Sequence, residues 1–203
     1  MKELIFSRSL LPAMERNTER IGFIDAGTGR QISYGQHRSR VARLSHAMSA
    51  ELGVGQADRV AVLSVNSVPY LELWHATMLG AAIMNPLNLR FSADELVYVL
   101  NDSGSQVVFV DSNFAPLVEQ IRSRTAVKSV VLLDEADAPA DVRYEELLAA
   151  AEERFAPEPE EDAPAVLMYT GGTTGHPKGV VLTQRAEVLN QYHMAMCAPF
   201  ADD

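Results

Sequence analysis

The sequence has very little cysteine and a shortage of basic residues. Cys197 is the only cysteine among 203 residues, so an internal disulfide is excluded, and we expect a cytoplasmic protein in a reducing compartment. Lysine and arginine together number 17 against 27 acidic residues, which gives a net charge of −10. A chain this acidic is not expected to bind nucleic acid, and a polyanionic substrate would require a local basic site.

Long apolar runs and metal-ligand spacings are missing as well. The apolar segments near the N-terminus are interrupted by Arg8, so we predict neither a signal peptide nor a membrane span. The spacing of the five histidines fits no zinc motif, and one cysteine cannot complete such a site. Of these histidines, we expect His37 and His46 on the exposed side of a helix, and we interpret His176 as a bystander.

Short apolar runs alternate with helical patterns along most of the chain. The runs expected to form strands cover residues 60–65, 81–84, 106–110 and 129–133. The patterns expected to form helices cover residues 35–52, 68–80, 92–100, 114–122 and 144–154. Nearly continuous apolar strands that alternate with helices favour the α/β class, with a largely parallel sheet covered by helices on both faces. Residues 21–25 and 31–34 add a small N-terminal β-hairpin.

A Pro- and Glu-rich segment divides the chain. We expect residues 1–153 to form the α/β part, residues 154–164 to form a solvated linker, and residues 165–203 to form a strand, a loop and a helix. The prolines and like charges of the linker disfavour a packed element there. The linker would deliver the last strand to its own position.

The loop after that strand concentrates the residue types that hold phosphate. Its sequence is Tyr-Thr-Gly-Gly-Thr-Thr-Gly-His-Pro-Lys-Gly-Val at residues 169–180. Glycines let a ligand approach the backbone, successive N–H groups bind anions, and hydroxyl and ammonium groups add donors and charge. The candidate phosphate-binding residues are three threonines, three glycines and one lysine: Thr170, Gly171, Gly172, Thr173, Thr174, Gly175 and Lys178.

Other glycine-rich loops fit this segment less well. In a Walker A loop the lysine is followed directly by Ser or Thr, whereas Gly179 follows Lys178 here, and no G-x-G-x-x-G fingerprint is present. Pro177 fixes its own backbone and favours an extended conformation at His176, so we expect the loop to stay open instead of starting a helix. A merely flexible turn would need neither the threonines nor the lysine.

This loop resembles the phosphate-loop signature of the adenylate-forming superfamily, which includes acyl-CoA synthetases, peptide-synthetase adenylation domains and luciferases. The commonest form of the signature has Ser in place of Gly171, and many members have His in place of Gln184. Pro-Leu-Asn-Leu-Arg, with Asn-Asp-Ser-Gly further on, looks most like the fatty or aryl acyl-CoA synthetases. The segments that resemble the family in the same order are residues 32–34, 58–60, 66–67, 79–81, 86–88 and 101–103.

The resemblance implies a ligase that uses ATP, Mg²⁺ and coenzyme A together with a small carboxylic acid. The carboxylate attacks the α-phosphate of ATP to give an acyl-adenylate and pyrophosphate, and the acyl group then passes to a thiol. In the loop, the threonines would hydrogen-bond β- and γ-phosphate oxygens, Lys178 would neutralise their charge, and the glycines would permit close approach. Thr174 is the candidate near Mg²⁺.

The resemblance also implies what lies beyond this sequence. In the family an adenine-binding strand, an acidic magnesium ligand, a ribose-binding aspartate and a C-terminal domain with the catalytic lysine follow the loop. We therefore expect the N-terminal part of a synthetase, with no catalytic residue in this chain, the C-terminal domain absent and no activity alone. The residues present specify neither acyl chain length nor oligomeric state. A non-catalytic nucleotide- or partner-binding module and a peptide-synthetase-type adenylation domain stay open as alternatives.

Overall fold

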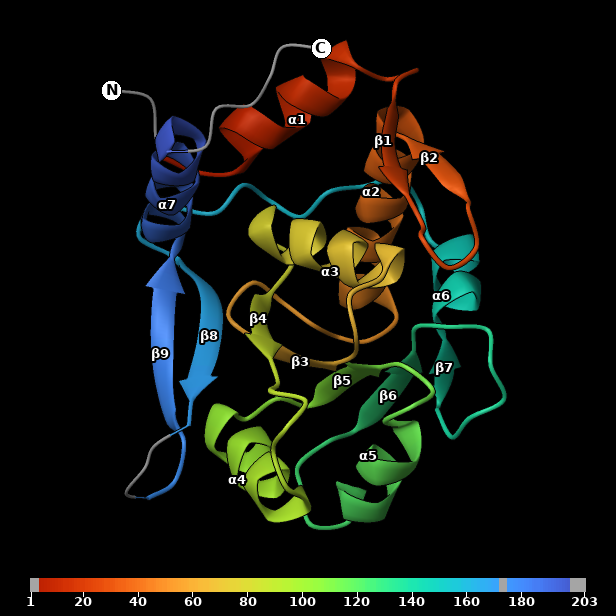
Figure 1. Cartoon of the computed structure of the whole chain (residues 1–203), viewed down its shortest axis with the longest axis vertical. Coiled ribbons are helices and arrows are strands. Elements are labelled where there is room, and N and C mark those ends of the chain that lie inside the picture. The colour runs from red at the N-terminus through yellow and green to blue at the C-terminus, as the bar shows by residue number, and fades with distance from the viewer. Residues whose placement is uncertain (1–3, 172–174, 198–203) are drawn as a thin grey trace.

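The computed structural model describes residues 4–171 and 175–197, and in this part a seven-stranded sheet crosses the molecule (Figure 1). Its strands are Arg59–Leu63 (β3), Ile83–Pro86 (β4), Val107–Val110 (β5), Ser129–Leu132 (β6), Val142–Arg143 (β7), Pro164–Thr170 (β8) and Lys178–Thr183 (β9). Their order is β7-β6-β5-β3-β4-β8-β9. All neighbours pair in parallel except β8 and β9, which form an antiparallel hairpin. The predicted α/β class and largely parallel sheet are confirmed.

Helices cover both faces of this sheet, as the unbroken apolar strands predict. They are Ser7–Arg16 (α1), Tyr34–Ala50 (α2), Val68–Met78 (α3), Ala93–Ser103 (α4), Ala115–Arg122 (α5), Tyr144–Ala150 (α6) and Gln184–Cys197 (α7). Successive side chains of a strand point to opposite faces, so Val60 and Val62 enter one core and Ala61 and Leu63 the other. The first core packs mainly against α2, α3 and α6, and the second packs against α4 and α5 (Figure 1).

A separate β-hairpin precedes α2. Ile21–Ile24 (β1) and Gln31–Ser33 (β2) pair antiparallel, which confirms the predicted hairpin. Ser33 ends β2 and caps α2: its Oγ accepts the Gln36 N–H (3.2 Å), and the Gln36 side chain accepts the Ser33 N–H (2.9 Å). This reciprocal cap satisfies two N–H groups at the helix start, so the junction between the hairpin and α2 is fixed.

The Pro- and Glu-rich segment between α6 and β8 has no helix or strand, yet it is held to the rest of the protein. Gln56 Nε2 donates to the Pro157 carbonyl (2.6 Å), and the Ala156 N–H donates to Ser45 Oγ (2.9 Å). Gly80, with φ 96°, lies beside it, and a Cβ there would be 2.8 Å from the Pro157 carbonyl oxygen. Only glycine combines that backbone angle with that close approach. The segment therefore follows one defined path from α6 to β8.

The buried face of α3 differs from the predicted one. The helical spacing favours an apolar face of four residues: Tyr70, Leu71, Trp74 and Met78. Of these only Met78 is fully buried, and the other three are half-buried. Leu73 and Glu72 are buried in their place. A carboxylate on a buried helix face contradicts a purely apolar pattern, and its partners, described below, explain why it is stable there.

Candidate functional site

The hairpin of β8 and β9 carries the predicted phosphate loop at its tip (Figure 1). β8 runs parallel to β4, so the loop leaves the sheet at the edge where the parallel strands have their carboxyl ends. Open α/β sheets bind ligands at this edge. β9 returns antiparallel, with Thr170 opposite Lys178 and Tyr169 opposite Gly179. The two ends of the loop are therefore held side by side.

The structure describes four of the seven predicted phosphate-binding residues, and all four are exposed: Thr170, Gly171, Gly175 and Lys178. The other three lie outside the described residues: Gly172, Thr173 and Thr174. The Thr170 hydroxyl makes a long hydrogen bond to the Lys178 carbonyl (3.4 Å). The first threonine and the lysine of the motif are thus brought to the same end of the hairpin.

Open space surrounds the two described glycines of the loop. A Cβ built at Gly171 or at Gly175 would meet no atom of the described residues within 4 Å. Gly179 differs, since a Cβ there would lie 3.0 Å from Leu167 Cδ1 and 3.2 Å from Tyr169 Cζ. Packing therefore explains the glycine at 179, whereas the loop glycines leave the backbone open to an approaching ligand.

Lys178 is the first residue of β9, and it is exposed. Within residues 4–171 and 175–197 no carboxylate pairs with its ammonium group, although the chain has 27 acidic residues. Arg185, seven residues further along the chain, shows the contrast, because it pairs with Glu161 (3.0 Å) and Asp162 (3.2 Å). An ammonium group left without a counter-charge at the mouth of a glycine-rich loop favours binding of a polyanion.

Two side chains of α4 contact the ends of the loop. The Tyr169 hydroxyl donates to Asp102 Oδ2 at 2.5 Å, and burial together with this hydrogen bond raises the pKa of Tyr169. The Tyr98 ring stacks on the His176 imidazole, with centroids 4.4 Å apart and planes inclined by 16°. His176, interpreted from the sequence as a bystander, therefore has a defined partner. The sequence alone could not show either contact, because both partners are distant in the chain.

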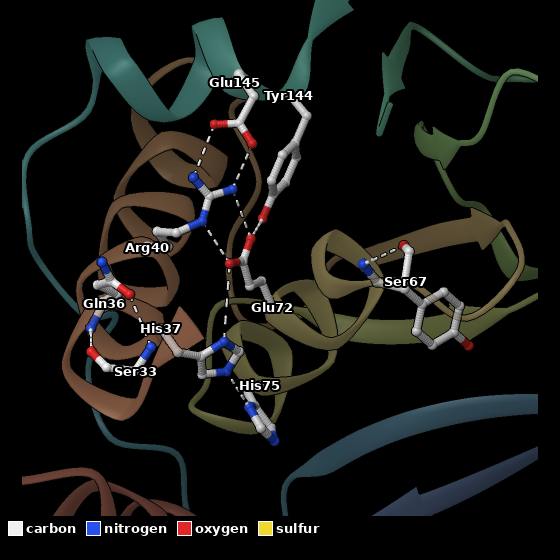
Figure 2. Close-up of polar contacts among 10 residues, drawn as sticks. Ser33, Gln36, His37, Arg40, Ser67, Glu72, His75, Tyr144 and Glu145 are labelled. Carbon is white, nitrogen blue, oxygen red and sulfur yellow. Dashed lines mark hydrogen bonds and ion pairs between the residues drawn. The ribbon is translucent and has the colours of Figure 1, made fainter. Parts of the chain in front are cut away.

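A second polar cluster lies inside the protein between α2, α3 and α6 (Figure 2). Arg40 donates to both carboxylate oxygens of Glu72 (2.6 and 3.1 Å) and to those of Glu145 (2.7 and 2.9 Å). The Tyr144 hydroxyl donates to Glu72 as well (2.7 Å). Burial lowers the pKa of Arg40, but the hydrogen bonds to Glu145 and Glu72 outweigh it and leave the pKa raised. The buried Glu72 charge is therefore compensated from two other helices.

Two histidines adjoin this cluster. His37 Nε2 lies 2.7 Å from His75 Nδ1, and the ring of Phe23 packs 4.4 Å from that of His37 (Figure 2 shows the histidine pair). The prediction that His37 lies on the exposed side of its helix is wrong, because α3 and the β1–β2 hairpin cover this side of α2. His46, predicted to be exposed as well, is half-buried. Burial lowers the pKa of His37 to about 3 and that of His75 to about 4.

The described residues show no cluster typical of metal binding. In that part of the chain no three or more histidine, cysteine or acidic side chains come together in a way that could hold a metal ion. Cys197 is exposed at the last position of α7. Among the helices of the described part, none has the length and apolar character needed to cross a bilayer.

A cavity of about 550 Å³ lies where the carboxyl ends of β3, β5 and β6 meet. Two of its acidic side chains, Asp111 and Asp134, hold the surrounding loops. Asp111 accepts the N–H groups of Val65 (2.8 Å) and Asn113 (3.0 Å), and Asp134 accepts the N–H of Ser112 (2.8 Å). We therefore assign these carboxylates a structural role, and the loop at the tip of β8 and β9 remains the candidate site.

The sheet, its helical layers and the loop at the carboxyl edge define an α/β protein of the adenylate-forming type. Residues 12–203 match the family model described as AMP-binding enzyme. The chain therefore belongs to the AMP-binding enzyme family, and the resemblance seen in the loop sequence is confirmed.

The proteins that this chain matches include CoA ligases. The long-chain-fatty-acid–CoA ligase of Thermus thermophilus is 37% identical over 173 residues, which are 85% of this chain and 31% of that protein. The 3-methylmercaptopropionyl-CoA ligase of Ruegeria lacuscaerulensis is 32% identical over 183 residues, which are 86% of this chain and 34% of that protein. The inhibitor-bound N-terminal domain of FACL13 from Mycobacterium tuberculosis has a TM-score of 0.73 and 31% identity, covering 91% of this chain and 45% of that one. The chain spans about a third of the length of these two curated relatives.

Proposed function

We propose that this chain supplies the phosphate-binding loop of an acyl-CoA synthetase, which activates a fatty or aryl carboxylic acid with MgATP and transfers the acyl group to coenzyme A. The observation that carries the proposal is Lys178 opposite Thr170 at the carboxyl edge of the sheet, with no carboxylate partner in the described part of the chain. The two relatives named as CoA ligases support the acid and thiol substrates. The single cysteine supports a cytoplasmic location.

The chemical task of the loop follows from the charge that the reaction moves. As the carboxylate attacks the α-phosphate, negative charge grows on the leaving pyrophosphate, and preorganised donors stabilise it. Lys178 would contribute its ammonium group and Thr170 its hydroxyl, while Gly171 and Gly175 would leave the backbone accessible. Bound Mg²⁺ would supply further charge neutralisation, with Thr174 near it.

The proposal treats the chain as part of one N-terminal AMP-binding domain. Residues 1–153 would be its α/β part, residues 154–164 its linker, and residues 165–203 its phosphate-loop segment. The catalytic lysine and the ribose aspartate of the family would come from segments other than these, so the 203 residues alone would bind nucleotide phosphates without completing the reaction. A peptide-synthetase-type domain is less well supported, because the relatives above are named as CoA ligases.

Substituting Lys178 by alanine tests this function. In the enzyme that contains this chain, we expect Lys178→Ala to slow ATP–pyrophosphate exchange by about 10²–10³-fold, the loss typical of one removed transition-state donor. Exchange measured across a panel of carboxylic acids would at the same time identify the acid. Lys128→Ala is the matched control, since Lys128 is an exposed lysine just before β6 and should leave the rate unchanged. An unchanged exchange rate in Lys178→Ala would contradict the proposed role of the loop.

A partner-binding module is a second candidate, and the edge of the sheet favours it. β9 is the outermost strand, and edge strands can pair with another chain. Apolar side chains are exposed on β9 and α7: Val180, Val181, Leu189, Tyr192, Met194 and Met196. The intact mass of the native protein separates the two candidates. A mass far above 22.2 kDa favours the synthetase, and a native product of 22.2 kDa favours the module.

A further inference from the structure

The proposed phosphate site leaves one feature unexplained, which is the pair of side-chain contacts from α4 to the loop. Figure 1 shows α4 beside the end of the β8–β9 hairpin that carries the loop. Tyr98 and Asp102 are four residues apart in α4, so they lie on the same face of the helix. Asp102 accepts a hydrogen bond from Tyr169, just before the loop, and Tyr98 stacks on His176, near its end. One helix face therefore holds both ends of the loop.

α4 is itself fixed at both ends and along one side. At its start Glu95 Oε2 accepts the Ser92 N–H (2.7 Å) and Ser92 Oγ accepts the Glu95 N–H (3.4 Å), which is a capping box. At its end Gly104 adopts the left-handed conformation (φ 65°). Three of its apolar side chains are buried in the second core: Leu96, Val99 and Leu100. A helix held in this way can fix the position of a segment that contacts it.

The loop has weaker anchors of its own among the described residues. A Cβ built at Gly171 or at Gly175 would meet no atom of these residues within 4 Å, and the Thr170 hydroxyl reaches the Lys178 carbonyl only at 3.4 Å. A loop that presents several donors to one polyanion binds more tightly when its conformation is fixed beforehand, because less conformational entropy is lost on binding. Contacts that fix the loop ends therefore bear on the affinity of the site.

We propose that Tyr98, Asp102, Tyr169 and His176 form an α4 clamp that fixes the two ends of the phosphate loop before the polyphosphate of a nucleotide binds. This inference rests on the proposed function, from which it takes the class of ligand. Tyr98 and Asp102 are positioning residues, since they act through His176 and Tyr169. The stack depends on an aromatic ring, so Tyr98→Phe keeps it and Tyr98→Ala removes it. The hydrogen bond depends on an acceptor, so Asp102→Asn keeps it and Asp102→Ala removes it.

The test uses the 203-residue chain, tripolyphosphate as the probe, and ¹⁵N relaxation of the backbone amides. In Tyr98→Ala and Asp102→Ala we expect the order parameters of Gly171 and Gly175 to fall to below about 0.6, the range of flexible backbone. We expect calorimetry to show tripolyphosphate binding weakened by about threefold to tenfold, as loss of one aromatic contact implies. Tyr98→Phe and Asp102→Asn should stay close to the unmutated chain in both measurements.

Asp94→Ala is the matched control, because Asp94 is an acidic residue of the same helix whose exposed side chain pairs with Arg124, away from the loop. It should change neither the order parameters nor the affinity, and thermal unfolding should show that every variant is folded. Where Lys178→Ala weakens tripolyphosphate binding, clamp variants that behave like Asp94→Ala would overturn the clamp, and so would a loss of order without a loss of affinity. Failure of the proposed function gives a different result, because Lys178→Ala and the unmutated chain would then bind tripolyphosphate equally poorly. In that case the order parameters of Gly171 and Gly175 alone decide whether α4 holds the loop ends.

Discussion

Replacing Arg40 by methionine is expected to lower the free energy of unfolding by about 3–5 kcal/mol, the usual cost of removing one partner of a buried ion pair. Glu72 has no exposed side-chain surface, and only 17% of the Arg40 side chain is exposed. Without the guanidinium group, the carboxylate would keep the Tyr144 hydroxyl as its hydrogen-bond donor but would lose the opposite charge. Denaturant unfolding of the unmutated chain and of the variant measures the difference directly.

Two further variants test whether the loss of stability comes from the burial of the Arg40–Glu72 pair. Arg124→Met removes an exposed pair with Asp94, whose side chains are 52% and 83% exposed, and should cost between about 0 and 1 kcal/mol. The double variant Arg40→Met/Glu72→Met removes both buried charges and should lose less than Arg40→Met alone, since an apolar pair leaves no uncompensated charge. Equal losses in the single and the double variant would contradict this account of the Arg40–Glu72 pair.

The same pair shows why part of the interior could not be predicted from the sequence. Helical spacing identified α3, but its buried face includes Glu72, whose partners Arg40 and Tyr144 lie 32 residues before it and 72 residues after it. His37 is a similar case, because its burial depends on α3 and on Phe23 of β1. The helical pattern around a polar residue does not indicate whether residues distant in the chain will cover it. The pattern of residues 35–52 therefore predicted that His37 faces solvent.

The sequence predicted correctly those structural features whose physical cause lies within a few neighbouring residues. Strands β3, β5 and β6 follow from unbroken apolar runs, because a strand buried on both faces needs an apolar residue at each position. β9, which the sequence did not predict as a strand, is exposed or half-buried along its length. The helix predicted over residues 92–100 is likewise observed as α4, and the capping box at Ser92 and Glu95 gives it a local start. α1 was not predicted, since Pro12 lies inside it, but Met14 is fully buried and its packing stabilises a helix that propensity disfavours.

The phosphate loop includes features that the sequence predicted and contacts that it did not predict. Its residue types and order were sufficient to predict a phosphate site and a family, and the family is confirmed. The open surroundings of Gly171 and Gly175 fit that prediction, whose chemical test is the Lys178 variant. The contacts of Tyr98 and Asp102 were not foreseen, because their i, i+4 spacing identifies a shared helix face and not what the face touches.

The second large effect is expected from pH, and its source is the His37–His75 pair. Lowering the pH from 7 to 5 should reduce the free energy of unfolding by about 4 kcal/mol through these two groups. Their pKa values in the folded protein are lowered to about 3 for His37 and about 4 for His75, first of all by burial, from an ordinary value of 6.5. The unfolded chain therefore takes up protons below pH 6.5 while the folded protein does not. Stability from this source is complete above pH 6.5 and is lost as the pH falls towards 4.

The comparison of variants isolates the histidines from the acidic residues that titrate in the same range. His75→Gln keeps a side chain that can hydrogen-bond to His37 Nε2 but cannot titrate, so the change in stability between pH 7 and pH 5 should shrink by about half. His193→Gln is the control, because His193 is exposed on α7 and should leave the pH dependence unchanged. His37 is buried and His75 is half-buried. Protonation of His37 would meet the Glu72 carboxylate, 4.0 Å from Nδ1 and already bound to Arg40, and also the positive charge of Arg40, which lowers the pKa of His37 further. A pH dependence that is identical in the unmutated chain and in His75→Gln would show that the pair is not the source of the acid sensitivity.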